Sequence, residues 1–216
     1  MFHSVMHRFT RGIRERGWLG FVAYLCRQRS PIYRSIVFTK STCECRALEV
    51  RSLTVIRYPE PISVDERVLQ QIRGHGRVEM IREFERLFAD GCELWLGWIG
   101  TEIVGVCWSR RGTRRTDYFV QITEEDANIL SCFVFPSFRG KGVYPAMLQT
   151  MAATLMTQDH VKTVYIDCKS WNHPSVSGIL KAGFVRLGTG VRIHVGRRHW
   201  VVFNSCRTAN RPSLAS

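Results

Sequence analysis

A short turn at residues 139–142 holds the residue types of this sequence that best suit a chemical task. Gly140 and Gly142 have no Cβ, so the backbone there can approach a bulky anion closely. Arg139 and Lys141 alternate with the glycines and add positive charge. The spacing therefore predicts a turn that binds phosphate.

A strand before this turn and a helix after it must hold it in place. Phe133 to Phe135 form an apolar, extended run, and Pro136 ends it. After the turn, apolar residues recur every four positions and mark one face of a helix: Val143, Met147, Met151 and Leu155. Because the first N–H groups of a helix have no acceptor within it, they point back at the turn and suit a phosphate.

The chain is strongly basic, with 31 Lys and Arg against 18 Asp and Glu among 216 residues, a formal charge of +13. This balance favours an acidic partner. It does not choose among nucleic acid, an anionic membrane surface, an acidic carrier protein and a phosphorylated ligand.

The cysteines indicate a reduced, cytoplasmic protein without a bound metal. Cys107, Cys132 and Cys168 lie in apolar, strand-like runs, where cysteine behaves as a small hydrophobic residue. Cys43 and Cys45 are separated by one residue, which is not a zinc-site spacing. The apolar run at 18–26 is shorter than the ~20 residues of a membrane span.

We expect three regions: a basic N-terminal extension over residues 1–35, one globular domain over 36–204 and a polar, flexible tail over 205–216. Hydrophobic patterns predict strands at 33–40, 47–57, 93–99, 101–110, 163–168, 184–189 and 191–203. They also predict helices over 65–89, interrupted at 74–76, and over 175–182.

The N-terminal extension has two interpretations. Its apolar residues recur at helical spacing with arginines between them, as in an amphipathic helix that lies on an anionic membrane through residues 1–30. The alternative is a helix that docks on the domain and leaves its arginines in water.

Three segments together resemble the GNAT N-acyltransferase superfamily over residues 47–203. The first is the strand and turn from Val134 to Gly142, which is similar to the family's pyrophosphate loop. The second is Asn172-His-Pro-Ser followed by a short helix and Gly183-Phe184. The third is the predicted hairpin over 93–110. The resemblance implies an α/β (α+β) fold with a mixed, mostly antiparallel central sheet flanked by helices.

The resemblance also implies how an acyl-CoA is held. The backbone of Phe133 and Val134 would bind the pantetheine arm, and Asn172 would bond to the same arm. The pyrophosphate would lie on the turn and the helix start, at Arg139, Gly140, Lys141, Gly142, Val143 and Tyr144. An amine would then attack the thioester directly, so that the protein supplies alignment and a polarised carbonyl.

Three positions depart from the family pattern. Tyr144 stands where the family has Gly or Ala, and Ile179 stands where a tyrosine protonates the leaving thiolate. Asn128 falls where some relatives have a glutamate base, and asparagine cannot accept a proton at neutral pH, although it can orient a water. Asp126, two residues earlier on the same strand face, is the nearest carboxylate to act as base. Further candidates are Glu124, Asp167 and His173.

The function expected first is an N-acyltransferase that moves an acyl group from acyl-CoA, such as acetyl-CoA, to the primary amine of a small molecule. A long-chain N-acyltransferase supplied by acyl carrier protein is an alternative, because that carrier is acidic and the loop at 110–115 is basic. Two further interpretations are a nucleic-acid-binding module and an inactive acyl-CoA sensor. The nucleic-acid interpretation rests on charge alone, since the sequence has no recognised nucleic-acid-binding motif.

Overall fold

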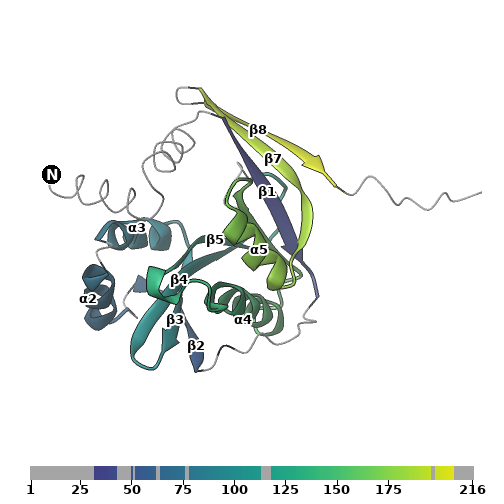
Figure 1. Ribbon diagram of the computed structural model, residues 1–216. Helices are drawn as coiled ribbons and strands as arrows, with labels where there is room; N and C mark the ends of the chain where they lie inside the picture. The colour runs from purple at the N-terminus through teal and green to yellow at the C-terminus, as the bar shows by residue number, and fades with distance from the viewer. Residues whose placement is uncertain are drawn as a thin grey trace, which may run out of the picture.

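The computed structural model describes residues 32–42, 50, 52–61, 64–75, 78–112, 118–195 and 198–206 (Figure 1). The N-terminal extension up to residue 31 and the tail from 207 lie outside these ranges, so their predicted roles stay predictions. The first strand, β1, spans Ile32–Lys40, and it therefore begins four residues before the expected start of the domain.

The eight strands of the described chain form one sheet in the order β2-β3-β4-β5-β6-β1-β7-β8. After β1, the strands are β2 Leu53–Tyr58, β3 Glu93–Ile99, β4 Glu102–Arg111, β5 Asp126–Val134, β6 Thr163–Lys169, β7 Val185–Val195 and β8 Arg198–Ser205. Every neighbouring pair is antiparallel except β5 and β6, which are parallel. The expected mixed, mostly antiparallel sheet is confirmed.

Helices cover the two faces of this sheet (Figure 1). The helices are α2 Glu66–Gly74, α3 Val78–Ala89, α4 Val143–Thr157 and α5 His173–Lys181, with a 3-10 turn, η2, at Pro136–Phe138. The core on one face is formed with α4 and α5, and the core on the other face with α2 and α3. We call these the α4 face and the α2 face.

Helix α4 packs on the sheet as its four-residue period predicts. Val143, Met147, Met151 and Leu155 are all buried in the core of the α4 face. A Cβ on Gly97 of β3 or Gly105 of β4 would lie 2.7 or 2.6 Å from the sulfur of Met147. The two glycines therefore let the helix come close to the sheet.

The prediction for the C-terminal strands was wrong in one respect. Strands were expected at 184–189 and 191–203, but β7 continues through Gly190, which pairs with Ser35 on one side and Phe203 on the other. A side chain at Gly190 would overlap the ring of Phe119, which packs over this part of the α2 face. Gly190 thus makes room for an aromatic ring and does not end the strand.

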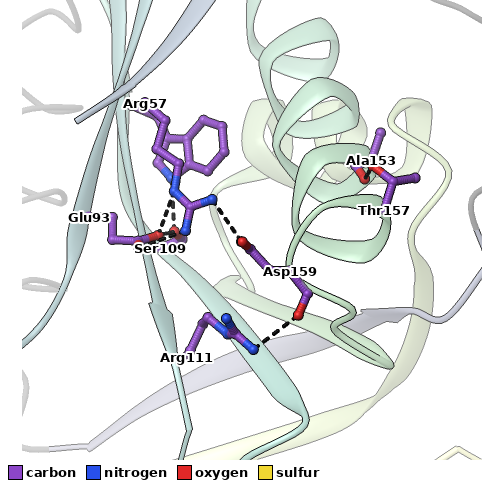
Figure 2. A network of polar contacts seen from close by, with 8 residues as sticks. Arg57, Glu93, Ser109, Arg111, Ala153, Thr157 and Asp159 are labelled. Carbon is purple, nitrogen blue, oxygen red and sulfur yellow. Dashed lines mark hydrogen bonds and ion pairs between the residues drawn. The ribbon is translucent and has the colours of Figure 1, made fainter. Parts of the chain in front are cut away.

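A network of ion pairs holds the end of α4 against the sheet (Figure 2). Arg57 of β2 donates to both carboxylate oxygens of Glu93 on β3, at 3.0 and 2.7 Å. Its third nitrogen lies 2.8 Å from the carboxylate of Asp159, which follows α4. Ser109 joins the network, because it accepts from Trp95 at 2.8 Å and donates to Glu93 at 3.3 Å. We call this the pinned end of the sheet.

No helix in the described ranges is long and apolar enough to cross a membrane.

Candidate active site

Strands β5 and β6 separate part of the way along their length. They pair only from Asp126 to Ile129 on β5 and from Thr163 to Ile166 on β6. Beyond these residues β5 runs on to Val134 and β6 to Lys169 without pairing to each other. We call the opening between residues 130–134 of β5 and 167–169 of β6 the wedge. Backbone groups along this edge of β5 therefore do not bond to β6.

A β-bulge in β5 accompanies the separation. Leu130 pairs with Trp108 and Phe133 pairs with Val106, so that Ser131 and Cys132 stand opposite Cys107 alone. Ser131 has a φ of 46°, an uncommon conformation for a residue other than glycine. Because a bulge bends its strand and adds twist, it turns β5 away from β6 where the wedge begins.

The turn after β5 has the geometry that its glycines predict. Gly140 and Gly142 both have φ of 77°, in the left-handed region that favours glycine. Arg139 donates from Nε to the carbonyl of Val134 at 3.1 Å, and its guanidinium lies over the Phe133 ring at 5.3 Å. The arginine is thereby held at the mouth of the wedge, next to the turn.

The start of α4 fits a phosphate. Gly142 is the N-cap residue and supplies no capping side chain, and the first intrahelical bond runs from the N–H of Ala146 to Gly142 at 3.2 Å. The N–H groups of Val143 and Tyr144 therefore precede the helical ladder. A Cβ on Gly140 would meet nothing within 4 Å, so the space beside the turn is open. The predicted phosphate-binding residues are brought together here.

Asn172 lies at the far side of the wedge, where β6 leads into α5. It is the N-cap residue of α5, yet its side chain makes no capping hydrogen bond. Its backbone N–H donates to the carbonyl of Lys169 at 2.8 Å, which fixes it next to the last residue of β6. The side-chain amide is thus kept close to the wedge without serving the helix.

Tyr144 reaches into the wedge from the α4 face. Its hydroxyl lies 3.2 Å from the hydroxyl of Ser175 on α5, and its ring fills the place that a side chain on Gly178 would take. Burial raises the pKa of Tyr144 well above its usual value, and the nearby thiol of Cys132 raises it further. The large residue that departs from the family pattern is therefore matched by a glycine on the facing helix.

Two thiols in this region, those of Cys107 and Cys168, remain protonated at neutral pH. A hydrogen bond with Cys132 and burial raise the pKa of Cys107, and burial raises the pKa of Cys168 to about 11. Because the thiolate is the nucleophile, neither cysteine is poised for covalent catalysis.

The two predicted catalytic residues lie in different environments. Asp126 begins β5 at the end away from the wedge, about 13 Å from Leu130 at the usual rise of a strand. Its carboxylate accepts hydrogen bonds from the N–H and the hydroxyl of Thr123 at 2.8 and 2.6 Å. Asn128 lies one residue before the last paired position of β5, so it sits at the root of the wedge. The structure brings Asn128 to the wedge and leaves Asp126 outside it.

The weaker candidates are dispersed. Glu124 and His173 are exposed, at the turn before β5 and at the first residue of α5, and Asp167 lies on the β6 wall of the wedge. Within the described ranges, no group of three or more His, Cys, Asp or Glu side chains is arranged to hold a metal ion.

Arg110 was not predicted as a site residue, since the sequence shows it only at the start of a basic loop. It lies directly across from Asn128 on β4 and is 9% exposed. Gly178 and Ser175, the contacts of Tyr144, were missed as well. Each becomes visible only through a neighbour that is distant in the sequence.

Comparison with known proteins places the chain in one family. The sequence profile of the acetyltransferase (GNAT) family matches residues 61–184, more than half of the chain. No curated protein matches the chain.

Two solved structures show the same fold. An acetyltransferase of the GNAT family from Colwellia psychrerythraea superposes with a TM-score of 0.50 at 18% identity, over 79% of this chain and 59% of that one. A tandem GNAT protein from the clavulanic acid biosynthesis pathway superposes with a TM-score of 0.50 at 15% identity, over 86% of this chain and 57% of that one. The chain thus spans less than two thirds of either protein.

Proposed function

Because this chain belongs to the acetyltransferase (GNAT) family, we propose that it transfers an acyl group from an acyl-CoA to the primary amine of a small molecule. The observation that supports the proposal most is the wedge between β5 and β6 with the glycine turn and the start of α4 at its mouth. This arrangement offers β5 backbone that does not pair with β6, and N–H groups before the helical ladder of α4 beside two cations.

We assign the binding of the CoA portion to residues on both sides of the wedge. The pyrophosphate is held by the backbone of Gly140, Gly142, Val143 and Tyr144, with the charges of Arg139 and Lys141 close by. The backbone of Phe133 and Val134 on one side, and the amide of Asn172 on the other, hold the pantetheine arm. When bound, acyl-CoA supplies the thioester carbonyl at which the amine reacts.

The state of two thiols supports direct attack by the amine. Cys107 and Cys168 have raised pKa values and hold their protons, so neither favours a covalent acyl-enzyme. The Tyr144 hydroxyl also keeps its proton and, beside Ser175, is available to donate in the wedge. The roles of Asn128 in orienting the acceptor and of Asp126 as a base stay part of the proposal.

Calorimetric titration with CoA tests the donor side. We expect the double variant Arg139→Gln/Lys141→Gln to bind CoA about 10- to 100-fold more weakly, because each lost charge removes a charge-assisted contact to phosphate. The matched control is Arg73→Gln/Arg86→Gln, which removes the same charge from exposed positions on α2 and α3. Equal CoA affinity in all three proteins, or no CoA binding by the parent protein, would refute the site.

Release of free thiol from acetyl-CoA in the presence of amines tests the reaction. We expect turnover that depends on the amine, which distinguishes an enzyme from an acyl-CoA sensor. Replacing acetyl-CoA by palmitoyl-CoA and by an acyl carrier protein thioester identifies the donor. Faster turnover with the carrier protein would favour the long-chain alternative. Of the basic loop at 110–115 proposed to contact that carrier, residues 113–115 lie outside the described residues, and so does the segment 1–30 proposed to contact a membrane.

A further inference from the structure

On the α2 face, two polar side chains stand next to each other at the root of the wedge. Arg110 of β4 pairs directly with Asn128 of β5. Trp108 and Leu130, which lie two residues away along the same two strands, belong to the core formed with α2 and α3. Because side chains alternate along a strand, Arg110 and Asn128 share that face.

Both side chains are more than nine-tenths buried and both offer donors. Arg110 is 9% exposed and Asn128 is 3% exposed. The Nδ2 group of Asn128 finds no hydrogen-bond partner in the described part of the chain. The Arg110 guanidinium keeps some contact with solvent, and no hydrogen bond or ion pair among the described residues engages it. A buried donor or cation without a partner costs free energy of folding. Such a pair is retained at a cost to stability, which points to a ligand.

The carboxylates near this pair are engaged elsewhere. Asp126, on the same strand face as Asn128, accepts both of its described hydrogen bonds from Thr123. Arg111, the next residue of β4, faces the other side and donates to the carbonyl of Asp159 at 3.0 Å. The donors of Arg110 and Asn128 are therefore not taken up by Asp126.

The position of the pair relates it to the proposed reaction. Asn128 is next to Ile129, the last residue of β5 that pairs with β6, so the pair lies where the wedge begins. The phosphate turn and α4 lie on the opposite face. An acyl-CoA held from the α4 face and an amine held on the α2 face would meet through the wedge.

We propose that Arg110 and Asn128 bind an oxyanion of the acceptor, so that the acceptor is an amine that also carries a carboxylate or a phosphate. This inference rests on the proposed acyl transfer and names its substrate class. A guanidinium presents two parallel N–H groups to such an oxyanion, and the Asn128 amide adds a third donor from the neighbouring strand.

Matched pairs of amines test the inference. Glycine and glycinamide differ in the carboxylate, and O-phosphoethanolamine and ethanolamine differ in the phosphate. With acetyl-CoA as donor, we expect the protein to prefer the charged member of one pair, which identifies the oxyanion. In Arg110→Gln, KM for that amine should rise by about 10-fold or more, with little change for the neutral member. The matched control is Arg111→Gln, the adjacent arginine on the opposite face.

The Asn128 contact has its own variant. Asn128→Asp keeps the size of the side chain but places a carboxylate beside Arg110, so it should repel an oxyanion and abolish the preference for the charged amine. CoA affinity should stay at the parent value in this variant. An unchanged preference in both Arg110→Gln and Asn128→Asp would overturn the inference.

Direct binding separates this inference from the proposed function. Saturation-transfer NMR detects glycine and O-phosphoethanolamine on the protein without any thioester. If CoA does not bind but the oxyanion does, and binding disappears in Arg110→Gln, the site stands and the proposed reaction fails. If CoA binds and neither probe binds, the site fails alone.

The melting temperature distinguishes an arginine kept for a ligand from one that stabilises the fold. Replacing a buried cation that lacks a partner by an apolar residue of similar length should raise the melting temperature. We therefore expect Arg110→Met to melt higher than the parent protein while losing the preference for charged amines. A lower melting temperature would show that Arg110 serves the fold.

Discussion

The two ends of the central strands are built in opposite ways. At the pinned end, Arg57 satisfies Glu93 and Asp159, and Ser109 and Trp95 complete the network (Figure 2). At the wedge end, β5 leaves β6 beyond Ile129, and just before that point the buried amide of Asn128 has no partner in the described residues. The difference suggests a rule for this fold: polar groups are satisfied where α4 is held and left open where we propose that a ligand enters.

The largest effect should come from breaking the pinned end. Arg57→Ala leaves two partly buried carboxylates without their cation, and we expect the free energy of unfolding to fall by about 3 kcal/mol. Urea denaturation measures this loss, and calorimetry should show CoA affinity near the parent value. Arg73→Ala is the control, because its pair with Glu66 is exposed and should contribute at most about 1 kcal/mol.

If CoA binding collapsed together with stability in Arg57→Ala while the protein remained folded, the two ends would be coupled and the comparison would be wrong.

Alkaline pH should lower the free energy of unfolding through Cys168, which lies at the wedge end. The pKa of Cys168 is raised from 9.0 to about 11, so its stabilising contribution is complete below pH 9 and is lost as pH rises through 11. Two units correspond to at most about 2.7 kcal/mol. Cys168→Ser removes the thiol, and unfolding measured from pH 8 to 11 should depend less on pH in this variant. If stability fell equally with pH in the two proteins, the titrating group would be a residue other than Cys168.

Gly178→Ala tests how tightly Tyr144 fills the wedge. The added methyl group would overlap the Tyr144 ring, and overpacking of this kind costs about 1–3 kcal/mol. In a Tyr144→Ala background the same substitution should stabilise α5 by about 0.5–1 kcal/mol, because alanine is the better helix former. The change of sign in this double-mutant cycle is the decisive measurement. Additive effects would mean that Tyr144 does not lie against α5.

The smallest effect is expected from Asp126→Asn. Both hydrogen bonds from Thr123 reach the same carboxylate oxygen, and both become weaker bonds to a neutral amide oxygen, which should cost about 1 kcal/mol. The pH dependence of turnover distinguishes the two roles of the residue. A structural carboxylate leaves the pH–rate profile unchanged, whereas loss of the fall in rate at low pH would identify Asp126 as the base.

Local patterns in the sequence were enough to predict the elements that form the proposed acyl-CoA site. The glycines and cations at 139–142 predict the turn because left-handed backbone favours glycine, and both glycines have φ of 77°. The four-residue period predicts α4 because it reports which face is buried. The β7 strand was the local failure, since Gly190 resembles a break and instead accommodates Phe119.

The acceptor side could not be predicted in this way. Arg110 and Asn128 are neighbours only through the register of β4 and β5, which a β-bulge at Ser131 shifts. The match of Tyr144 with Gly178 depends on how α4 and α5 pack. Neither arrangement leaves a local pattern, because each contact joins residues that are remote in the chain.

The sequence by itself determined the family resemblance, the phosphate turn and the helix behind it, since these depend on backbone preferences and on the period of apolar residues over a few turns. Only the tertiary structure decided where β5 and β6 separate, which polar groups are satisfied and which remain open. Those outcomes depend on strand register and long-range packing, and Arg57 finds Asp159 only after β2 and α4 have been brought together.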